Sequence, residues 1–168
     1  MLVYHPALDP YHSAFRMLRL LLASTAGSLE IDKIRILDFY LTFPSQLLSL
    51  TVTRPLMKRR STVAGKPNIY KFNGHPILVF AQMRPLQETA LHLLSSSGII
   101  RRDEFLRGVV TLSEVSKNQP LAEAAAARNA ANSELMSFLV SDLGTMPLSG
   151  QDGLKSRSKL MEHRYDPI

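Results

Sequence analysis

Apolar residues recur at helical spacing over residues 10–25, and this pattern indicates a fold built on packed helices. Leu18 and Leu22 lie four residues apart on one broad apolar face, while Arg16 and Arg19 are placed to reach water. An Asp-Pro pair directly precedes the segment, and this pair suits the cap and the first turn of a helix. We therefore expect a core-facing amphipathic helix over this segment.

A second helical segment follows at once and is apolar around much of its circumference. Ser28 suits its start, because acidic residues in the next turn favour the positive end of the helix dipole. Pro44 ends it. Residues 45–50 can add one or two helical turns, and residues 51–53 alternate like a strand.

The second half of the chain predicts a further helical unit with a small hairpin. Residues 85–97 form an apolar helical stripe, after which Gly98 fits the left-handed position beyond a helix. Residues 99–100 and 109–112 are typical of two strands joined by a polar connection. Residues 119–144 then predict the longest helix. The expected fold is mainly α with a small β-hairpin (α+β) and is winged helix-turn-helix-like.

The length of 168 residues suits one compact domain, within which four parts are distinguished. They are a helical helix-turn-helix unit at 1–53, a basic loop at 54–74, a winged-helix-like unit with a long C-terminal helix at 75–145, and a docking tail at 146–168. We expect the basic loop to be irregular, because it combines proline, glycine and asparagine with many cations. The tail keeps apolar residues among glycine, serine and charge, so we expect it to dock on something.

Positive charge is concentrated in the basic loop. The chain has a formal net charge of +6, and no acidic residue occurs between Phe39 and Gln87. The candidate nucleic-acid-binding cations are Arg54, Lys58, Arg59, Arg60, Lys66 and Lys71. Cations of this kind neutralise DNA phosphates and make binding dependent on salt. The alternative is an ordinary solvated surface loop, and the sequence leaves both interpretations open.

Several function classes lack their usual signatures. The chain has no cysteine, which excludes thiol chemistry, and it has neither a Gly-rich phosphate loop nor a nucleophile elbow. We expect no enzyme activity, no cofactor and no metal. The apolar stretches are too short to cross a membrane, and the first residues do not resemble a secretory signal, so we expect a cytoplasmic protein.

Several short motifs, spread over the whole chain, together resemble a known family. They are Tyr4-His5-Pro6-Ala7, Asp9-Pro10-Tyr11-His12, Arg35-Ile36-Leu37-Asp38-Phe39-Tyr40, Phe43-Pro44, Met83-Arg84-Pro85-Leu86-Gln87, Ser97-Gly98, Pro147-Leu148, Gly150-Gln151-Asp152-Gly153-Leu154-Lys155 and Leu160-Met161-Glu162-His163-Arg164-Tyr165-Asp166. The sequence resembles the small middle components, class five, of bacterial three-component ABC systems. Lamassu-type anti-phage and anti-plasmid defence systems belong to this grouping.

The resemblance implies a winged helix-turn-helix fold and an adaptor role. Such a subunit would link a coiled-coil, SMC-like ABC ATPase to an effector subunit of nuclease type. As a separate hypothesis, the basic loop would touch DNA that the ATPase holds. The candidate partner-binding residues are Leu154, Leu160, Met161, Arg164 and Tyr165. We expect these residues to dock on the ATPase or the effector, because ordering such a tail requires apolar area from a partner.

Two alternatives remain at the level of sequence. The first is a stand-alone winged-helix DNA-binding regulator, with residues 45–50 or 85–97 as the recognition helix. Its surface chemistry is poor, because the second of these helices has no Arg or Lys in its middle for guanine contact. The other is a small enzyme that uses His5, Asp9 and His12, although Asp9 also suits a helix cap.

Overall fold

The computed structural model describes the chain except for residues 1–4, 6–7, 66–71, 73 and 162–168 and the side chains of residues 117–118. The elements, in chain order, are α1 Pro10–Ala23, β1 Ser28–Glu30, α2 Ile31–Thr42, the 3₁₀ helices η2 Pro44–Ser49 and η3 Arg54–Leu56, α3 Met57–Ala64, α4 Pro76–Ser96, α5 Arg102–Phe105, β2 Val109–Thr111, the 3₁₀ helix η4 Glu114–Asn118, α6 Pro120–Ala131, α7 Ser133–Ser137, the π-helical segment η5 Phe138–Leu143, and α8 Leu154–Ser158. The fold is therefore mainly α with one small antiparallel sheet, as predicted.

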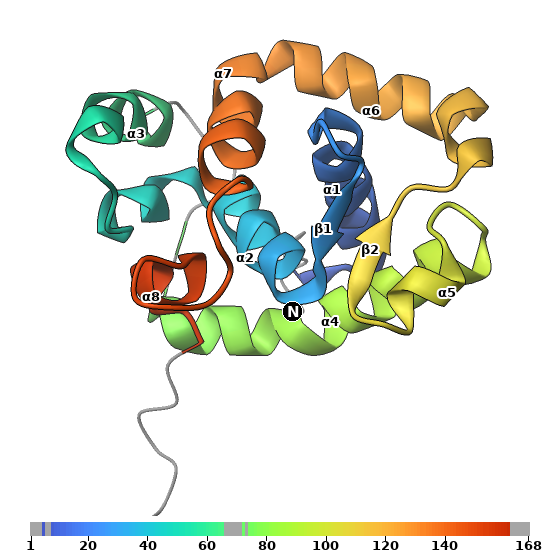
Figure 1. Ribbon diagram of the computed structural model, residues 1–168, viewed down its shortest axis with the longest axis horizontal. Helices are drawn as coiled ribbons and strands as arrows, with labels where there is room; N and C mark the ends of the chain where they lie inside the picture. Colours follow the sequence, from blue (N-terminus) through green and yellow to red (C-terminus); the bar gives the residue numbers. More distant parts are fainter. Residues whose placement is uncertain (1–4, 6–7, 66–71, 73, 162–168) are drawn as a thin grey trace, which may run out of the picture.

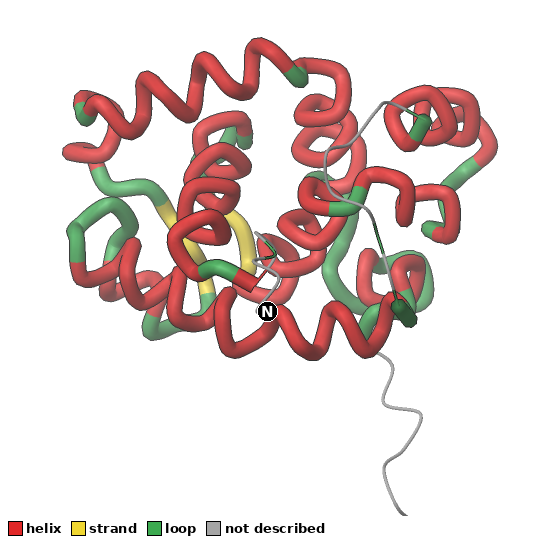
Figure 2. The backbone as a smooth tube through the Cα atoms, turned by 180° about the vertical axis from the view of Figure 1, so that it is seen from behind, coloured by secondary structure: helices red, strands yellow, loops and turns green. Residues whose placement is uncertain are grey.

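The helices form a frame around two central ones. Helix α4 runs along one side and α6 along the opposite side, with α1 and α2 between them (Figure 1). Helix α1 packs against α2, α4 and α6. The tube view from behind shows the same arrangement, with the two short strands near the middle of the molecule (Figure 2). None of the helices in the described ranges is long and apolar enough to cross a membrane.

Helix α1 begins and ends close to where its sequence indicates. The Oδ1 atom of Asp9 accepts hydrogen bonds from the backbone N–H groups of Tyr11 (2.8 Å) and His12 (3.2 Å), so the predicted cap is present. The expectation that Arg16 and Arg19 reach water is wrong, because they are only 7% and 6% exposed. Helix α6 and the polar residues of α2 cover the face that these two side chains occupy.

The start of α2 differs from the prediction. Ser28 lies in strand β1 and is not a helix cap, and α2 begins only at Ile31, after Glu30 in an extended conformation. In α2, every residue from position 33 to 42 is buried, as its nearly continuous apolar surface indicated. Phe43 closes the helix just before Pro44, and η2 adds the predicted further turns.

The sheet pairs segments that are distant in sequence. Strand β1 pairs antiparallel with β2 in the register Leu29 with Val110. The predicted hairpin between residues 99–100 and 109–112 is reduced to a single bridge between Ile100 and Leu112. The connection between these two residues folds into helix α5. A winged helix is not confirmed, because a wing needs two properly paired strands.

Helix α4 is longer than predicted and begins at Pro76, so Pro85 lies inside it. Pro85 has no N–H group to donate to the carbonyl one turn earlier, and it lies on the exposed side of the helix. The helix ends at Ser96, and Gly98 adopts the predicted left-handed conformation with φ of +75°. Helix α4, with 21 residues, is the longest in the described part of the chain.

The expected long helix over residues 119–144 is broken at Asn132. This residue has φ of −125° and ψ of 40°, which separates α6 from α7. After the break, η5 packs Phe138, Leu139 and Leu143 fully into the core. The break therefore lets one face of α6 cover α1 while the following turns enter the centre of the molecule.

The basic segment is partly helical, contrary to the expectation of an irregular loop. Residues 54–64 form η3 and α3, because Pro55 suits a first turn and Val63 and Ala64 are buried. Residues 51–53, predicted to alternate like a strand, form no strand. The remainder of the predicted loop includes residues 66–71 and 73, which lie outside the described residues.

Candidate partner-binding and nucleic-acid-binding surfaces

Of the six candidate nucleic-acid-binding cations, two are held by contacts within the chain. The Arg59 guanidinium bonds to the Asp142 carboxylate and donates to Ser137 Oγ at 2.8 Å. Its central carbon also lies 6.0 Å from the centroid of the Phe138 ring. Arg60 Nη1 donates to the Leu50 carbonyl at 2.7 Å. Both cations therefore attach α3 to neighbouring elements.

The other two described cations of this set lie free at the surface. Arg54 and Lys58 are exposed, and neither has an ion-pair partner among the residues that the structure describes. Lys66 and Lys71 lie outside the described residues. Arg54 and Lys58 are thus the two described cations of this set that are available to an anionic group of another molecule.

The C-terminal candidate residues divide into two groups. Leu154 is 0% exposed and Leu160 is 4% exposed, and both belong to the hydrophobic core, with Met161 packed against it. Arg164 and Tyr165 lie outside the described residues. The apolar area that we expected a partner to supply for Leu154 and Leu160 is supplied by the chain itself.

Backbone hydrogen bonds also hold the C-terminal segment in place. Leu154 donates to the Pro147 carbonyl at 2.8 Å, and Thr51 donates to the Arg157 carbonyl at 3.2 Å. In Figure 1, α8 lies beside one end of α4 and below α2. Lys155 Nζ forms an ion pair with Asp32 Oδ2, on α2, at 2.8 Å. The segment up to Met161 is thus an integral part of the domain.

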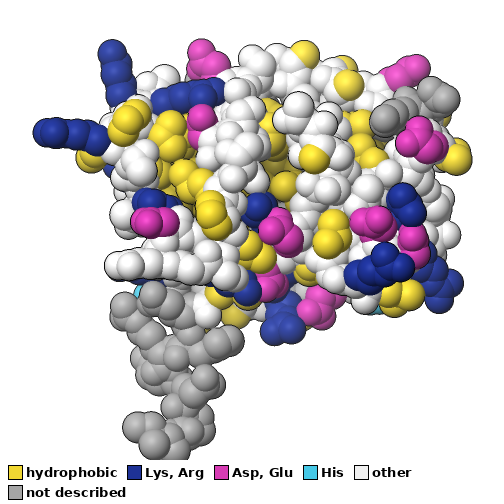
Figure 3. Space-filling view, viewed as in Figure 1, with side chains coloured by type: hydrophobic (Ala, Val, Ile, Leu, Met, Phe, Trp, Pro, Cys, Tyr) yellow, Lys and Arg dark blue, Asp and Glu magenta, His cyan; other side chains and the backbone are white. Residues whose placement is uncertain are grey.

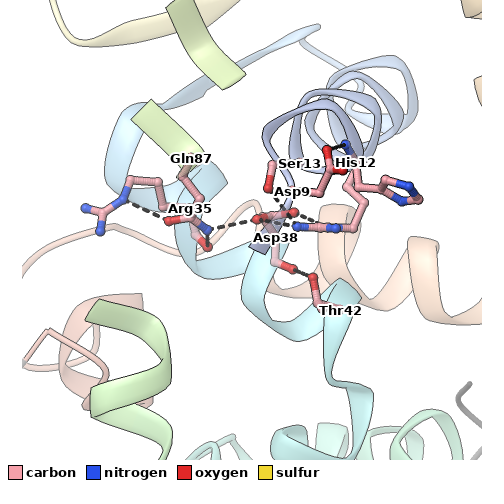
Figure 4. Close-up of polar contacts among 8 residues, drawn as sticks. Asp9, His12, Ser13, Arg35, Asp38, Thr42 and Gln87 are labelled. Atoms are coloured by element: carbon pink, nitrogen blue, oxygen red, sulfur yellow. Dashed lines mark hydrogen bonds and ion pairs between the residues drawn. The ribbon is translucent and has the colours of Figure 1, made fainter. Parts of the chain in front are cut away.

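A buried polar cluster, which the sequence did not predict, lies between α1, α2 and α4. Arg16 Nε donates to Asp38 Oδ1 at 2.5 Å, and Arg16 Nη2 donates to Asp38 Oδ2 at 3.2 Å. Gln87 Nε2 also donates to Asp38 Oδ2, at 2.8 Å (Figure 4). Asp38 is 0% exposed, so these bonds are its substitute for water. This cluster fixes the three helices relative to one another.

The cluster continues through Arg35 to the C-terminal segment. Arg35 Nε donates to Gln87 Oε1 at 3.1 Å, and Arg35 Nη1 contacts Asp32 Oδ1 at 3.1 Å. Asp32 in turn bonds Lys155. Burial lowers the pKa of Arg35, although its acidic neighbours oppose this. Polar contacts therefore run without a gap from α1 to α8.

The Asp32 carboxylate is expected to make the free energy of unfolding depend on pH. Burial raises its pKa, but hydrogen bonds and charges from Lys155 and Arg35 outweigh burial and hold the pKa below its ordinary value. The Asp32 carboxyl group therefore binds a proton more readily in the unfolded chain than in the folded one. Its contribution to stability is complete above about pH 4 and is lost as pH falls through the folded-state pKa.

We expect Asp32→Asn to flatten the pH dependence of the free energy of unfolding below about pH 4. The measurement is urea denaturation at several pH values. Lys155→Met removes a partner that lowers this pKa and should flatten the dependence in the same direction. A slope equal to that of the wild-type chain in both variants would contradict the assignment.

Two residues of the small-enzyme alternative, His5 and Asp9, make structural contacts. Asp9 caps α1, and the His5 ring lies 5.7 Å from the Phe43 ring, centroid to centroid. His12 is exposed on the first turn of α1. Within the described ranges, no group of three or more His, Cys, Asp or Glu side chains is placed to hold a metal ion.

Comparison with known protein families covers almost the whole chain. Residues 2–166 match the family described as ABC-three component (ABC-3C) system Middle Component 5. The chain belongs to this family. No curated protein and no solved structure matches the sequence of this middle component. Since the match spans the helical frame, both surfaces described above belong to the family region.

Proposed function

We propose that this middle component is a non-catalytic adaptor in a bacterial anti-phage or anti-plasmid defence complex. It would link a coiled-coil, SMC-like ABC ATPase to an effector of nuclease type. The observation that carries the proposal is the family match over residues 2–166, which gives the chain its place as the middle one of three components. The middle subunit of such a system, if it joins the other two, needs at least two contact surfaces.

The buried charges of the domain support a structural role. Arg16, Arg35 and Asp38 are each nearly or fully buried, and their polar atoms bond to one another or to Gln87 and Asp32. Such a network fixes the orientation of packed helices. A rigid core of this kind suits an adaptor, which must hold two partners in a constant relation.

The C-terminal segment is the first proposed contact surface. Leu154 and Leu160 anchor it to the core, and we assign the contact with the ATPase or the effector to Met161, Arg164 and Tyr165. This division differs from the original expectation, since the two leucines are already buried. The segment thus begins from a fixed point on the domain.

Nucleic-acid contact is a second candidate role, and it concerns the basic segment. Arg54 and Lys58 favour it because they are exposed without a carboxylate partner in the described residues. Lys66 and Lys71 would extend the contact along a phosphate backbone. Since Arg59 bonds Asp142 and Arg60 bonds the Leu50 carbonyl, we expect the chain to contact only a few phosphates.

Capture with the tagged full-length chain tests the adaptor proposal. We expect the wild-type chain to capture the ATPase and the effector encoded with it, each in a separate experiment. Ending the chain after Met161 should reduce capture of one of them at least about tenfold and leave the melting temperature unchanged, because the buried anchors remain. Unchanged capture of both would reject the tail as a contact. Failure of the wild-type chain to bind either would reject the adaptor role.

A further inference from the structure

Helices α3 and α7 border a surface hollow that has no role in the contacts described above. Its volume is about 370 Å³. The residues that line it are Pro55, Lys58, Arg59, Thr62, Val63 and Glu134. Those from η3 and α3 recur at spacings of three and four, so they form one face of a helix. In Figure 3, hydrophobic surface is visible in this region beside Lys and Arg side chains.

One wall of the hollow is fixed in position. Arg59 lines it, but its guanidinium is bound by Asp142 and Ser137 and lies over Phe138. The charge of Arg59 is therefore neutralised inside the chain, and its aliphatic stem is the part left to line the hollow. Val63, only 1% exposed, forms part of the floor. A preformed, largely apolar hollow suits an apolar side chain.

The rim has the opposite character, because it carries unneutralised positive charge. Lys58 lies on the hollow and Arg54 lies one turn before it, and both are exposed without an ion pair in the described part of the chain. Glu134 is the acidic group on the side of α7, and it has a partner of its own. The α3 rim thus favours an acidic neighbour.

We propose that this hollow binds an acidic segment of a partner protein. One large apolar side chain of that segment would fill the hollow, and flanking carboxylates would pair with Lys58 and Arg54. The proposal rests on the adaptor function above and supplies the second contact surface that linking two partners requires. Duplex DNA fits the same place less well, because the two exposed cations that the structure describes there neutralise few phosphates and an apolar hollow does not stabilise a phosphate.

Two single substitutions test the proposal without altering the core. Thr62→Phe fills the hollow from an exposed position, and Lys58→Glu reverses the charge of the rim. We expect each variant to lose at least about tenfold in affinity for either the ATPase or the effector, measured with purified full-length proteins. Affinity for the other partner should be unchanged. Arg107→Glu is the matched control, because Arg107 is exposed and has no ion pair in the described residues. It follows α5, which lies on the other side of the molecule from α3 (Figure 1).

The outcomes separate this inference from the adaptor proposal. Equal binding of wild type and both hollow variants to both partners would overturn the inference and leave the adaptor role standing. Binding of neither partner by the wild type would overturn both. Loss of duplex DNA binding by Lys58→Glu, with partner binding intact, would make the face a nucleic-acid contact and overturn the inference.

A photo-crosslinker placed at position 62 tests the chemistry of the occupant. We expect the crosslinked peptide of the partner to contain a large apolar residue next to Asp or Glu. A crosslink to a basic or uncharged peptide would contradict the charge argument. The melting temperature of each variant is measured first, and values within a few degrees of wild type show that binding losses are not unfolding.

Discussion

Replacing Asp38 with alanine is expected to destabilise the domain by about 3–5 kcal/mol. Asp38 is 0% exposed, and it accepts bonds from Arg16 and Gln87. Its removal takes from the buried Arg16 guanidinium the carboxylate that Nε and Nη2 both bond, and the cost of keeping that charge buried without Asp38 exceeds the value of the lost bonds. The measurement is the free energy of unfolding from urea denaturation.

Two further variants keep this prediction testable if Asp38→Ala does not fold. Asp38→Asn retains an acceptor oxygen and should lose less stability. Arg16→Met combined with Asp38→Leu removes both charges and should recover most of the loss. Asp152→Ala is the control, because its side chain is 87% exposed in an ion pair with Arg157 and should cost at most about 1 kcal/mol. A cost below about 1 kcal/mol for Asp38→Ala would contradict a structural role for the cluster.

Replacing Leu154 with alanine is expected to lower the free energy of unfolding by about 2–5 kcal/mol, although this residue lies only 14 positions before Ile168. Leu154 is 0% exposed, so truncation leaves a cavity in the core. We also expect faster proteolysis near residues 146–153, because α8 would separate from the domain more often. Urea denaturation and limited proteolysis provide the two measurements.

Leu106→Ala is the control for this prediction. Leu106 is 77% exposed, so its truncation should change stability by less than about 0.5 kcal/mol. If Leu154→Ala were equally mild, the C-terminal segment would not be anchored to the core in solution. The whole segment would then be free for a partner, as the sequence alone first suggested.

The features that could be predicted from sequence depend on neighbouring residues. The Asp9 cap, the end of α2 before Pro44 and the left-handed Gly98 each follow from the conformational preference of one or two side chains. The helical character of the fold followed from apolar spacing in the same way. Family motifs, which are short and ordered along the chain, gave the correct family.

The features that were missed depend on residues distant in sequence. Strand β1 exists because residues 28–30 pair with residues 109–111. The sequence of neither short segment indicates that it pairs with the other. Pro85 resembles a helix start, and only the packing of the preceding turns shows that α4 begins earlier. Both errors shortened or displaced an element and did not change the fold class.

The candidate sites were less predictable than the fold. A run of cations such as Lys58-Arg59-Arg60 does not reveal which guanidinium finds a carboxylate, because Asp142 lies 83 positions after Arg59. Likewise, the helical pattern of α1 places Arg16 on the face expected to reach water. Its burial depends on its bond to Asp38, which Gln87 also bonds. Charge composition therefore indicates a surface, while the fold decides which charges stay available.

The adaptor role is tested most directly by asking whether this chain joins its two partners. The effector subunit is tagged and captured from mixtures that contain the ATPase, with and without the middle component. The account predicts that the ATPase is captured only when the middle component is present, in one complex whose mass contains all three proteins. Capture of the ATPase to the same extent in its absence would contradict the account.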